Sequence, residues 1–421
     1  GSRTTVIPRL DGATSRHLGF LLAAALRRLE LGAAPVLAVV SDLPRLSPAE
    51  ALEDYQKKSL SAPQGVDVYS RAKSLLADYG YDVRHVSPRD PVLPDPVDAV
   101  LWFQPRRDST PVLTQLSQHL GHGGHAIIAL QHFNIQQRQY RGTGFATVHW
   151  PQPQFQDVDR YLRLFGVEQV REVLFDRTRH HLEIDTQVNR SAVREYDAQR
   201  VALPFLIRAV GANFSDQSPL TRHLGDLLFI WGNRFDFDPA MLHAADMTAE
   251  VLVTTTAHAW AYDWRGGWLP AAVLDEQANA TLSGPQALAV ALTGRFPVVD
   301  AVRTEDAGTQ LVPHEAAGTP GELVLVGSSE MFKDQHLLSP GFAHEQMLLN
   351  VVANAVHGPD MALLQGRRAA SVRGFAVASP MTRSAWRITV IAGGPGLLGL
   401  LALWRHRHRR YRHRRRGVVR T

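Results

Sequence analysis

Short apolar runs alternate with helical patterns along most of the chain. Runs such as AVLWF (residues 99–103) and AIIAL (residues 126–130) contain no polar residue and are bounded by polar or glycine-containing turns. Uninterrupted apolar runs of this kind are typical of strands that are covered on both faces. Helical patterns of roughly ten to fifteen residues separate them, as in βαβ units. The pattern therefore predicts an α/β fold with a mostly parallel sheet, or sheets, flanked by helices.

The same pattern suggests how the chain is organised. An amphipathic helix is expected over residues 15–31, a helix is expected from about Thr110, and another should end at Gly358. The middle of the chain is less regular, with strand-like stretches in REVLFD, HHLEIDTQV and VALPFLIRAV. We expect an N-terminal helical lead-in (1–32), a first α/β half (33–200), a second α/β half (201–358) and a membrane-proximal tether (359–387).

The segment 388–404 has no charged residue in 17 positions, which is the low end of the length needed to span a bilayer. Arg387 and Arg405 flank it, and Trp386 and Trp404 stand where interfacial aromatic residues are common. Residues 405–421 contain nine arginines and no acidic residue. The segment is therefore predicted to be a transmembrane helix followed by a basic cytoplasmic tail, with the body of the chain extracytoplasmic.

Charge is distributed unevenly along the 421 residues. Without the nine tail arginines, the 45 basic residues fall to 36 against 40 acidic ones, so the body is mildly acidic although the whole chain is basic. A nucleic-acid-binding domain normally carries its basic residues on a folded face. A nucleic-acid-binding protein that uses the arginine-rich tail is therefore kept only as an alternative, and no nucleic acid is expected as a partner.

Several catalytic motifs are missing from the sequence. None of the four lysines follows a glycine, so there is no Walker-type phosphate loop, and neither H-E-x-x-H nor G-x-S-x-G occurs. The chain has no cysteine, which excludes a Cys nucleophile and thiolate metal sites. GHGGH (residues 121–125) stands between a helix and a strand, the reverse of the order in a phosphate loop, and is interpreted as a helix end and turn. We expect no enzymatic activity, no cofactor and no metal site, including at His180, His181, Glu183 and Asp185.

Two stretches that follow predicted strands are candidate ligand- or partner-binding sites. Residues 130–144 are expected to form a loop at the carboxyl edge of the sheet, where ligands of α/β proteins bind. Amide and imidazole groups suit a polar or glycan-like ligand or a protein partner, although the same groups could serve only to satisfy the backbone. In the second stretch (326–334), helix capping is the competing interpretation. The candidate residues are Gln131, His132, Asn134, Gln136, Gln137, Arg138, Ser328, Ser329 and Glu330.

An ordered set of stretches resembles a known family. DAVLWFQP, LTQLSQHLGHGGHAIIAL, QALAVALTG, GELVLVGSSEMFKD and EQMLLNVVANAV, followed by the apolar segment and its arginines, resemble the auxiliary subunit of gliding-motility-type ABC transporters (GldG-like) over most of residues 35–405. The resemblance implies a flavodoxin/amidotransferase-like fold, related to intraflagellar-transport proteins, beside a permease and a separate ATPase. The family's N-terminal span is missing, as expected if the chain is the C-terminal portion of a longer permease fusion.

The resemblance implies a non-enzymatic accessory subunit, for substrate binding or as a scaffold, anchored in the lipid bilayer by one C-terminal span. An extracytoplasmic hydrolase or sugar-active enzyme on the same fold is the first alternative. That alternative needs a nucleophile or a pair of carboxylates in one cleft, which the sequence does not identify.

Overall fold

The computed structural model describes residues 4–366 except 8, 12–13, 42–66, 89, 107–108, 142–144, 191–192, 305–307 and 315–317. The chain divides into two compact units, Gly1–Val372 and Arg373–Thr421, and every described residue belongs to the first. The predicted transmembrane helix (388–404) and basic tail (405–421) lie outside the described residues. Within the described residues, no helix combines the length and the apolar character that a membrane span requires.

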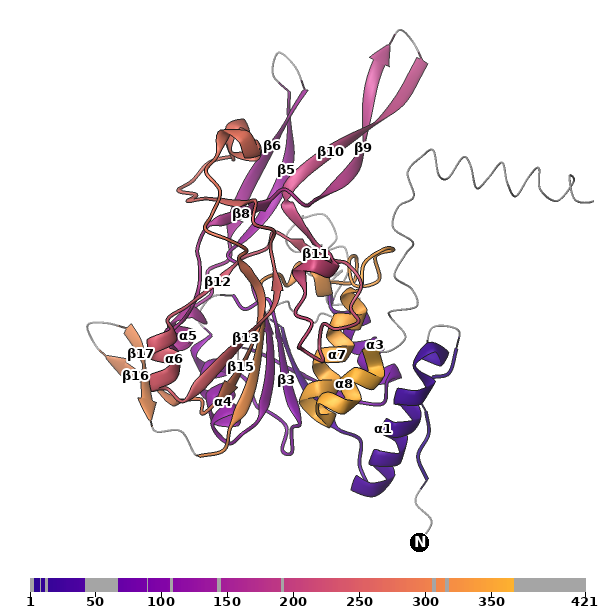
Figure 1. Ribbon diagram of the computed structural model, residues 1–421, viewed down its shortest axis with the longest axis vertical. Coiled ribbons are helices and arrows are strands. Elements are labelled where there is room, and N and C mark those ends of the chain that lie inside the picture. Colours follow the sequence, from indigo (N-terminus) through magenta and orange to yellow (C-terminus); the bar gives the residue numbers. More distant parts are fainter. Residues whose placement is uncertain are drawn as a thin grey trace, which may run out of the picture. The chain divides into compact units, whose positions relative to one another are not determined.

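A nine-stranded sheet forms the centre of the fold (Figure 1). Five neighbouring strands are parallel and occur in the order β2-β1-β3-β4-β18. Four antiparallel strands extend the sheet beyond β18, through β15 to β13 on one branch and to β12 and β7 on the other. The strands are β1 (Val36–Ser41), β2 (Asp82–Val86), β3 (Ala99–Phe103), β4 (His125–Ala129), β7 (Val167–Gln169), β12 (Phe235–Phe237), β13 (Met247–Thr254), β15 (Ala287–Gly294) and β18 (Gly321–Val326).

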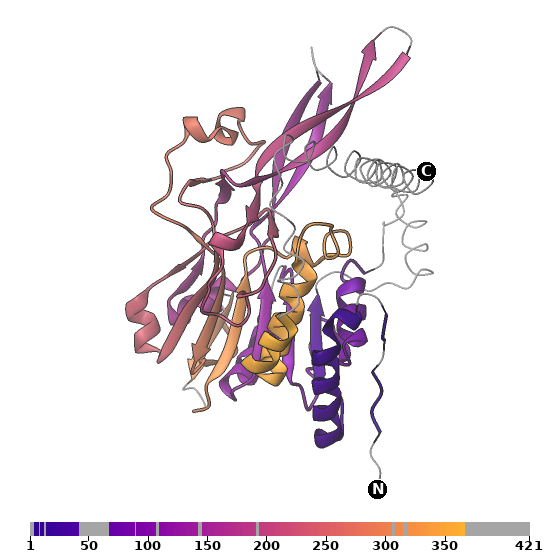
Figure 2. The ribbon, with the colours of Figure 1, turned by 45° about the vertical axis from the view of Figure 1, so that its right-hand side comes forward.

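Helices cover both faces of this sheet, which explains its uninterrupted apolar runs. Leu101 and Phe103 of β3 pack in the core beneath the first group of helices, while Val100 and Trp102 pack in the opposite core. Figures 1 and 2 show the two groups on opposite sides of the strands. The first group is α1 (Leu18–Leu31), α3 (Ser70–Asp78), α7 (His344–His357) and α8 (Pro359–Gly366). The second group is α4 (Thr110–Gly121), α5 (Asp159–Leu162) and α6 (Pro239–Ala244).

A second region, here called the β module, is built from antiparallel strands at the upper end of Figure 1. Its core is rich in aromatic residues, with Phe175 and Trp260 stacked at 5.6 Å between ring centroids. The β module consists of the hairpin β5 (Phe133–Arg141) and β6 (Phe145–Pro153), the pair β8 (Val173–Asp176) and β14 (Ala259–Tyr262), and the sheet β9 (Arg179–Arg190), β10 (Val193–Ala209) and β11 (Leu227–Ile230).

Shorter elements complete the described part of the chain. A separate hairpin joins β16 (Val298–Thr304) and β17 (Gly308–His314). The 3-10 helices are η1 (Thr14–His17), η2 (Arg163–Phe165), η3 (Gly211–Asn213), η4 (Ala271–Leu274), η5 (Glu276–Ala278) and η6 (Glu330–Phe332).

The α/β prediction with a mostly parallel, helix-flanked sheet is confirmed, and so are several element ends. Helix α1 ends at Leu31, where Gly32 adopts φ +83° and its N–H donates to the carbonyl of Arg28 at 2.8 Å. GHGGH is a helix end and turn, with Gly123 at φ +84°. These glycines adopt left-handed conformations that other residues rarely reach, and for that reason they mark helix ends in the sequence.

Other predictions need correction. The stretch 130–144 is not a loop, because residues from Phe133 onward form β5 and pair with β6. The boundary drawn between residues 200 and 201 falls inside β10, and strands from both predicted halves share the central sheet. The tether predicted to start at residue 359 begins instead with α8, which packs in the same core as α1 and α7. Residues 367–387 of that tether lie outside the described residues.

Candidate functional site

Three neighbouring parallel strands bring polar residues together at their carboxyl ends. Gln104 follows β3, Gln131 lies two residues after β4, and Ser328 lies two residues after β18. Gln104 has φ +50°, which is uncommon for a residue other than glycine and turns the chain sharply as it leaves the strand. All three side chains are buried, so their polar atoms need partners inside the protein.

Gln131 joins the two stretches that were singled out from the sequence. Its Oε1 accepts hydrogen bonds from the Ser329 N–H at 2.8 Å, the Ser329 hydroxyl at 3.1 Å and the Glu330 N–H at 3.4 Å. Its Nε2 donates to Oδ1 of Asn134. The carbonyl end of the side chain therefore satisfies backbone donors at the start of η6, while its amino end donates to Asn134.

Gln104 extends this amide network towards the β module. Its Nε2 lies 3.4 Å from both Asn134 Oδ1 and Gln154 Oε1, and its Oε1 accepts from the Tyr69 hydroxyl at 3.4 Å. We call Gln104, Gln131, Asn134 and Gln154 the amide network. Because it links β3, β4, β5 and the chain after β6, the network fixes the junction between the central sheet and the β module.

The remaining candidates after β18 are also held inside the protein. Ser328 donates its hydroxyl proton to the carbonyl of Ile230 at 2.7 Å, which connects β18 to β11. Glu330 is buried and pairs with Lys333, and burial lowers the pKa of that lysine. A buried ion pair of this kind fixes local structure, and removing either partner would leave an uncompensated charge.

His132 occupies the boundary between the amide network and a cavity. Its backbone N–H donates to Asn233 Oδ1 at 2.8 Å, and its ring Nε2 lies 2.9 Å from the carbonyl of Gln169. The same nitrogen is 3.5 Å from Asp159 Oδ2. Burial lowers the pKa of His132, which favours a neutral ring that donates its Nε2 proton to the Gln169 carbonyl.

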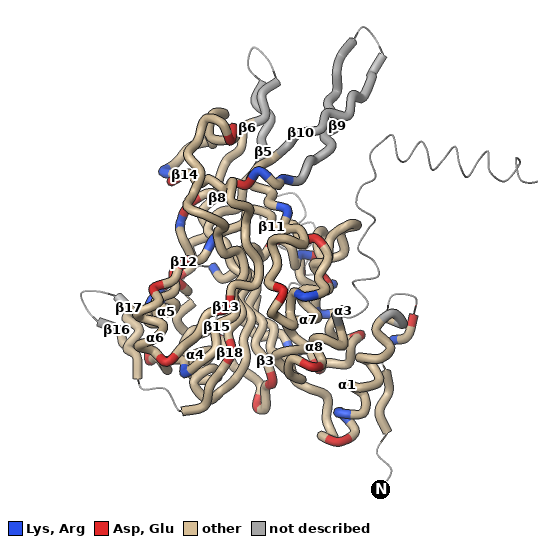
Figure 3. Tube along the Cα trace, in the orientation of Figure 1, with Lys and Arg blue, Asp and Glu red and all other residues tan. Residues whose placement is uncertain are grey.

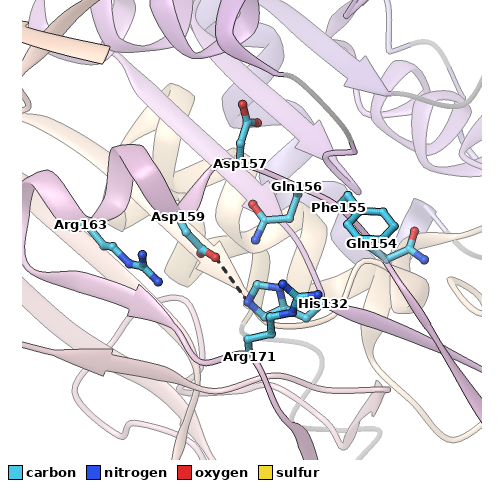
Figure 4. Close-up of a pocket in the computed structure, with 8 residues that line it drawn as sticks. All are labelled: His132, Gln154, Phe155, Gln156, Asp157, Asp159, Arg163 and Arg171. Carbon is cyan, nitrogen blue, oxygen red and sulfur yellow. Dashed lines mark ion pairs between the residues drawn. The ribbon is translucent and has the colours of Figure 1, made fainter. Parts of the chain in front are cut away.

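The cavity beside His132 has a volume of about 420 Å³ (Figure 4). Such a volume is ordinary for a small-molecule site. Gln154 belongs to both the cavity and the amide network, so the two features are continuous. The lining residues are His132, Gln154, Phe155, Gln156, Asp157, Asp159, Arg163 and Arg171.

Charges of both signs line this cavity, and two of the four, Asp157 and Arg163, have close partners. Asp157 accepts hydrogen bonds from the Ser109 N–H and from Arg160, both at 3.0 Å. Arg163 pairs with Glu168 at 2.6 Å. Asp159 is mostly buried, and burial raises the pKa of its carboxyl. No ion pair to Arg171 is formed by any carboxylate of the described residues, so its guanidinium is the cation that remains open to a ligand.

A family model described as ABC-type uncharacterized transport system matches residues 35–354. The chain belongs to this family. The match makes the protein an auxiliary component of an ABC-type transport system, and it spans the five parallel strands, the amide network and the cavity. No curated protein matches the chain.

The sequence-predicted residues of this family member fall into four groups in the structure. Gln131, Asn134, Ser328, Ser329 and Glu330 take part in internal hydrogen bonds at the carboxyl edge. His132 lines the cavity, whereas Gln136 is exposed on β5 opposite Trp150 of β6. Gln137 and Arg138 belong to β5, but their side chains lie outside the described residues.

Sequence reasoning missed most of the cavity. Apart from His132, its residues come from PQFQDVDR (153–160) and are joined by Arg163 and Arg171, and none of these was a candidate from the sequence. Three glutamines within five positions (152, 154 and 156) were the available signal, since such a polar run beside strands has no packing role.

For metals, the described residues contain no cluster of three or more His, Cys, Asp or Glu able to hold an ion, and the side chains of His180, His181, Glu183 and Asp185 lie outside them.

Proposed function

We propose that the protein is a non-enzymatic, extracytoplasmic accessory subunit of the GldG-like type, anchored beside an ABC permease and a separate ATPase. In this function the cavity at the carboxyl edge binds a small polar ligand for the transport system. The central observation is the continuity of that cavity with the amide network. A rigid, internally bonded frame holds an open, charged cavity at the position where α/β folds bind ligands.

The location rests on the sequence of the C-terminal segment. Residues 388–404 are uncharged and are followed by nine arginines, a pattern that favours a single span with the tail in the cytoplasm. The dependence on a separate ATPase rests on the missing phosphate loop. On this proposal the purified chain neither binds nor hydrolyses ATP.

One observation favours the hydrolase alternative, namely that two carboxylates, Asp157 and Asp159, line the same cavity. However, Asp157 already accepts hydrogen bonds from Ser109 and Arg160, which leaves it poorly placed to act as a base or nucleophile. The nucleic-acid alternative finds no support in the described part of the fold, where basic and acidic residues are interspersed along the trace (Figure 3). Binding without catalysis is therefore the function that these residues favour.

The experiment compares the full-length chain with a variant that lacks residues 388–421, each expressed with the neighbouring transport genes. The full-length chain should sediment with membranes and co-purify in detergent with a permease and an ATPase. The shortened variant should be released in soluble form and lose both partners. A full-length chain that is soluble without detergent would refute the anchor, and purification without any transport component would refute the accessory function.

The side of the membrane is tested on the same strain. Protease added to spheroplasts should degrade the body of the chain and leave the basic tail protected. Degradation only after the membrane is permeabilised would place the body in the cytoplasm and contradict the proposed orientation.

A further inference from the structure

The two least compensated charges of the cavity have opposite signs. Arg171 is exposed at the cavity, and its neighbour Arg163 differs from it by having an ion-pair partner, Glu168, at 2.6 Å. A guanidinium group matches the geometry of a carboxylate and can bind it through two parallel hydrogen bonds. Arg171 is therefore suited to the anionic group of a ligand.

Asp159 supplies the opposite charge. Its Oδ2 lies 3.5 Å from His132 Nε2, a long contact, while that ring nitrogen has a closer partner in the Gln169 carbonyl at 2.9 Å. Its Oδ1 has no hydrogen-bond partner among the described residues. Burial raises the pKa of this carboxyl and outweighs His132, Gln156 and Arg163, which stabilise the charged carboxylate in part. Such a carboxylate gains from a further cation, and an ammonium group on a ligand would provide one.

Both charges line the cavity, and no ion pair joins Asp159 to Arg171. Figure 4 shows Asp159 and Arg171 approaching His132 from different sides. The positive charge of Arg171 disfavours protonation of His132, which is consistent with a neutral ring between the two groups. A ligand that contacts both Arg171 and Asp159 would therefore carry an anionic group and a cationic group.

The remaining lining residues shape the cavity more than they contribute charge. The Gln156 side chain is held by Gln169 at 2.9 Å and by the Val158 N–H at 2.8 Å. Phe155 is 68% exposed and offers an aromatic face to an apolar substituent. A neutral sugar would leave both charges uncompensated, whereas a zwitterion with an apolar side group would satisfy all three features.

We propose that this cavity binds a small zwitterion that carries a carboxylate and an ammonium group, of the amino-acid or dipeptide class. The carboxylate pairs with Arg171, and the ammonium group lies against Asp159. This inference rests on the proposed ligand-binding function and assigns the class of ligand.

The test measures binding by calorimetry to the full-length chain in detergent. The probes are L-phenylalanine, L-alanine and L-alanyl-L-alanine, with three comparison compounds. N-acetyl-L-phenylalanine lacks the ammonium group, L-phenylalaninamide lacks the carboxylate, and glucose lacks both. At least one zwitterion should bind, and each comparison compound should bind at least about tenfold more weakly, the factor that corresponds to losing one good charged contact.

Three variants test which cavity residue contacts each charged group of the ligand. Arg171→Gln should abolish the preference for phenylalanine over its amide, and Asp159→Asn should abolish the preference over the N-acetyl derivative. Arg177→Gln is the matched control, because Arg177 is an exposed arginine that pairs with Glu276 and does not line the cavity. Its binding should equal that of the unaltered chain, and all three variants should keep the same melting temperature.

The outcomes separate this inference from the proposed function. Equal binding of zwitterions and glucose, no binding of any zwitterion, or unchanged selectivity in Arg171→Gln would each overturn the assignment of the ligand class. If the chain still co-purifies with its permease and ATPase in that case, the accessory function stands. Zwitterion binding by a chain that co-purifies with no transport component would instead contradict the accessory function alone.

Discussion

The central sheet and the β module bury their strands in different ways. In the sheet, β1, β3, β4 and β18 have helices on both faces, and most of the residues in the two cores are aliphatic. In the β module, antiparallel strands pack around a smaller core in which aromatic residues such as Phe175 and Trp260 make up a larger share. Polar groups of the sheet are therefore concentrated at the strand ends, whereas in the β module the exposed Gln136 of β5 is available to solvent or to a partner.

The difference explains where the candidate site lies. Both regions contribute to the junction, the sheet through Gln104 and Gln131, and the β module through Asn134. Two residues outside the β module add hydrogen bonds to β11. Ser328, which follows β18, donates to the Ile230 carbonyl, and His344 of α7 accepts from the Leu228 N–H. The cavity thus lies beside a cross-linked junction, and we expect the two regions to unfold together.

The strongest test of that expectation weakens each core separately. Trp260→Ala should cost about 3–5 kcal/mol, and Ile128→Ala on β4 should cost about 2–5 kcal/mol, because each leaves a cavity in a fully buried core. Urea unfolding is followed by tryptophan fluorescence and by far-UV circular dichroism. Both variants should show a single transition at lower urea concentration, with the same midpoint by both probes.

Two separated transitions in Trp260→Ala, with the later one at the midpoint of the unaltered chain, would contradict a single cooperative unit. The β module would then be an independent domain, and the hydrogen bonds at the junction would be too weak to couple it to the sheet.

The sequence predicted the sheet far better than it predicted the junction. Runs such as AVLWF signal a doubly covered strand by their composition, and Gly32 and Gly123 mark helix ends by their backbone conformation. The sequence carries no such signal for the partners of the buried glutamines. Gln131 bonds to Ser329 across a separation of 198 residues, and only the parallel register of β4 with β18 brings them together. The stretch after β4 was predicted to be a loop because it follows a buried strand, but residues from Phe133 onward pair with β6 and carry the polar Gln136 at an exposed position.

A pH titration probes the contact between the two regions at His344. The ring Nδ1–H donates to the His336 carbonyl at 2.8 Å, and Nε2 accepts from the Leu228 N–H at 3.0 Å, so both nitrogens are used by a neutral ring. Burial is the main reason that the pKa of His344 falls to about 4. The unfolded chain takes up a proton below its ordinary pKa of about 6.5, whereas the folded chain does not until about 4.

Stability should therefore be complete above pH 6.5 and should fall as the pH drops towards 4, by on the order of 3 kcal/mol for this residue. His336 and His357, whose pKa values burial also lowers to about 4, add to the same loss. Urea unfolding free energies at pH 7, 5.5 and 4.5 provide the measurement. The loss should be smaller in His344→Gln than in the control variant His243→Gln, which alters an exposed histidine. An identical pH dependence in both variants would show that His344 does not couple stability to pH.

The smallest expected effects compare two glutamines that lie five residues apart. Gln131→Ala removes the acceptor for the buried N–H groups of Ser329 and Glu330, which should cost about 1–3 kcal/mol. Gln136→Ala changes an exposed position on β5 and should cost less than about 0.5 kcal/mol, but it should weaken transport or assembly if that face of the β module contacts a partner. Melting temperature and transport activity are measured for both variants.

If Gln136→Ala lowers the melting temperature as much as Gln131→Ala, the exposed position on β5 has a structural role, and the contrast between a buried junction and an exposed position on the hairpin is wrong. If Gln136→Ala is stable and fully active, this position makes no contact that transport requires, and the cavity is left as the proposed binding site.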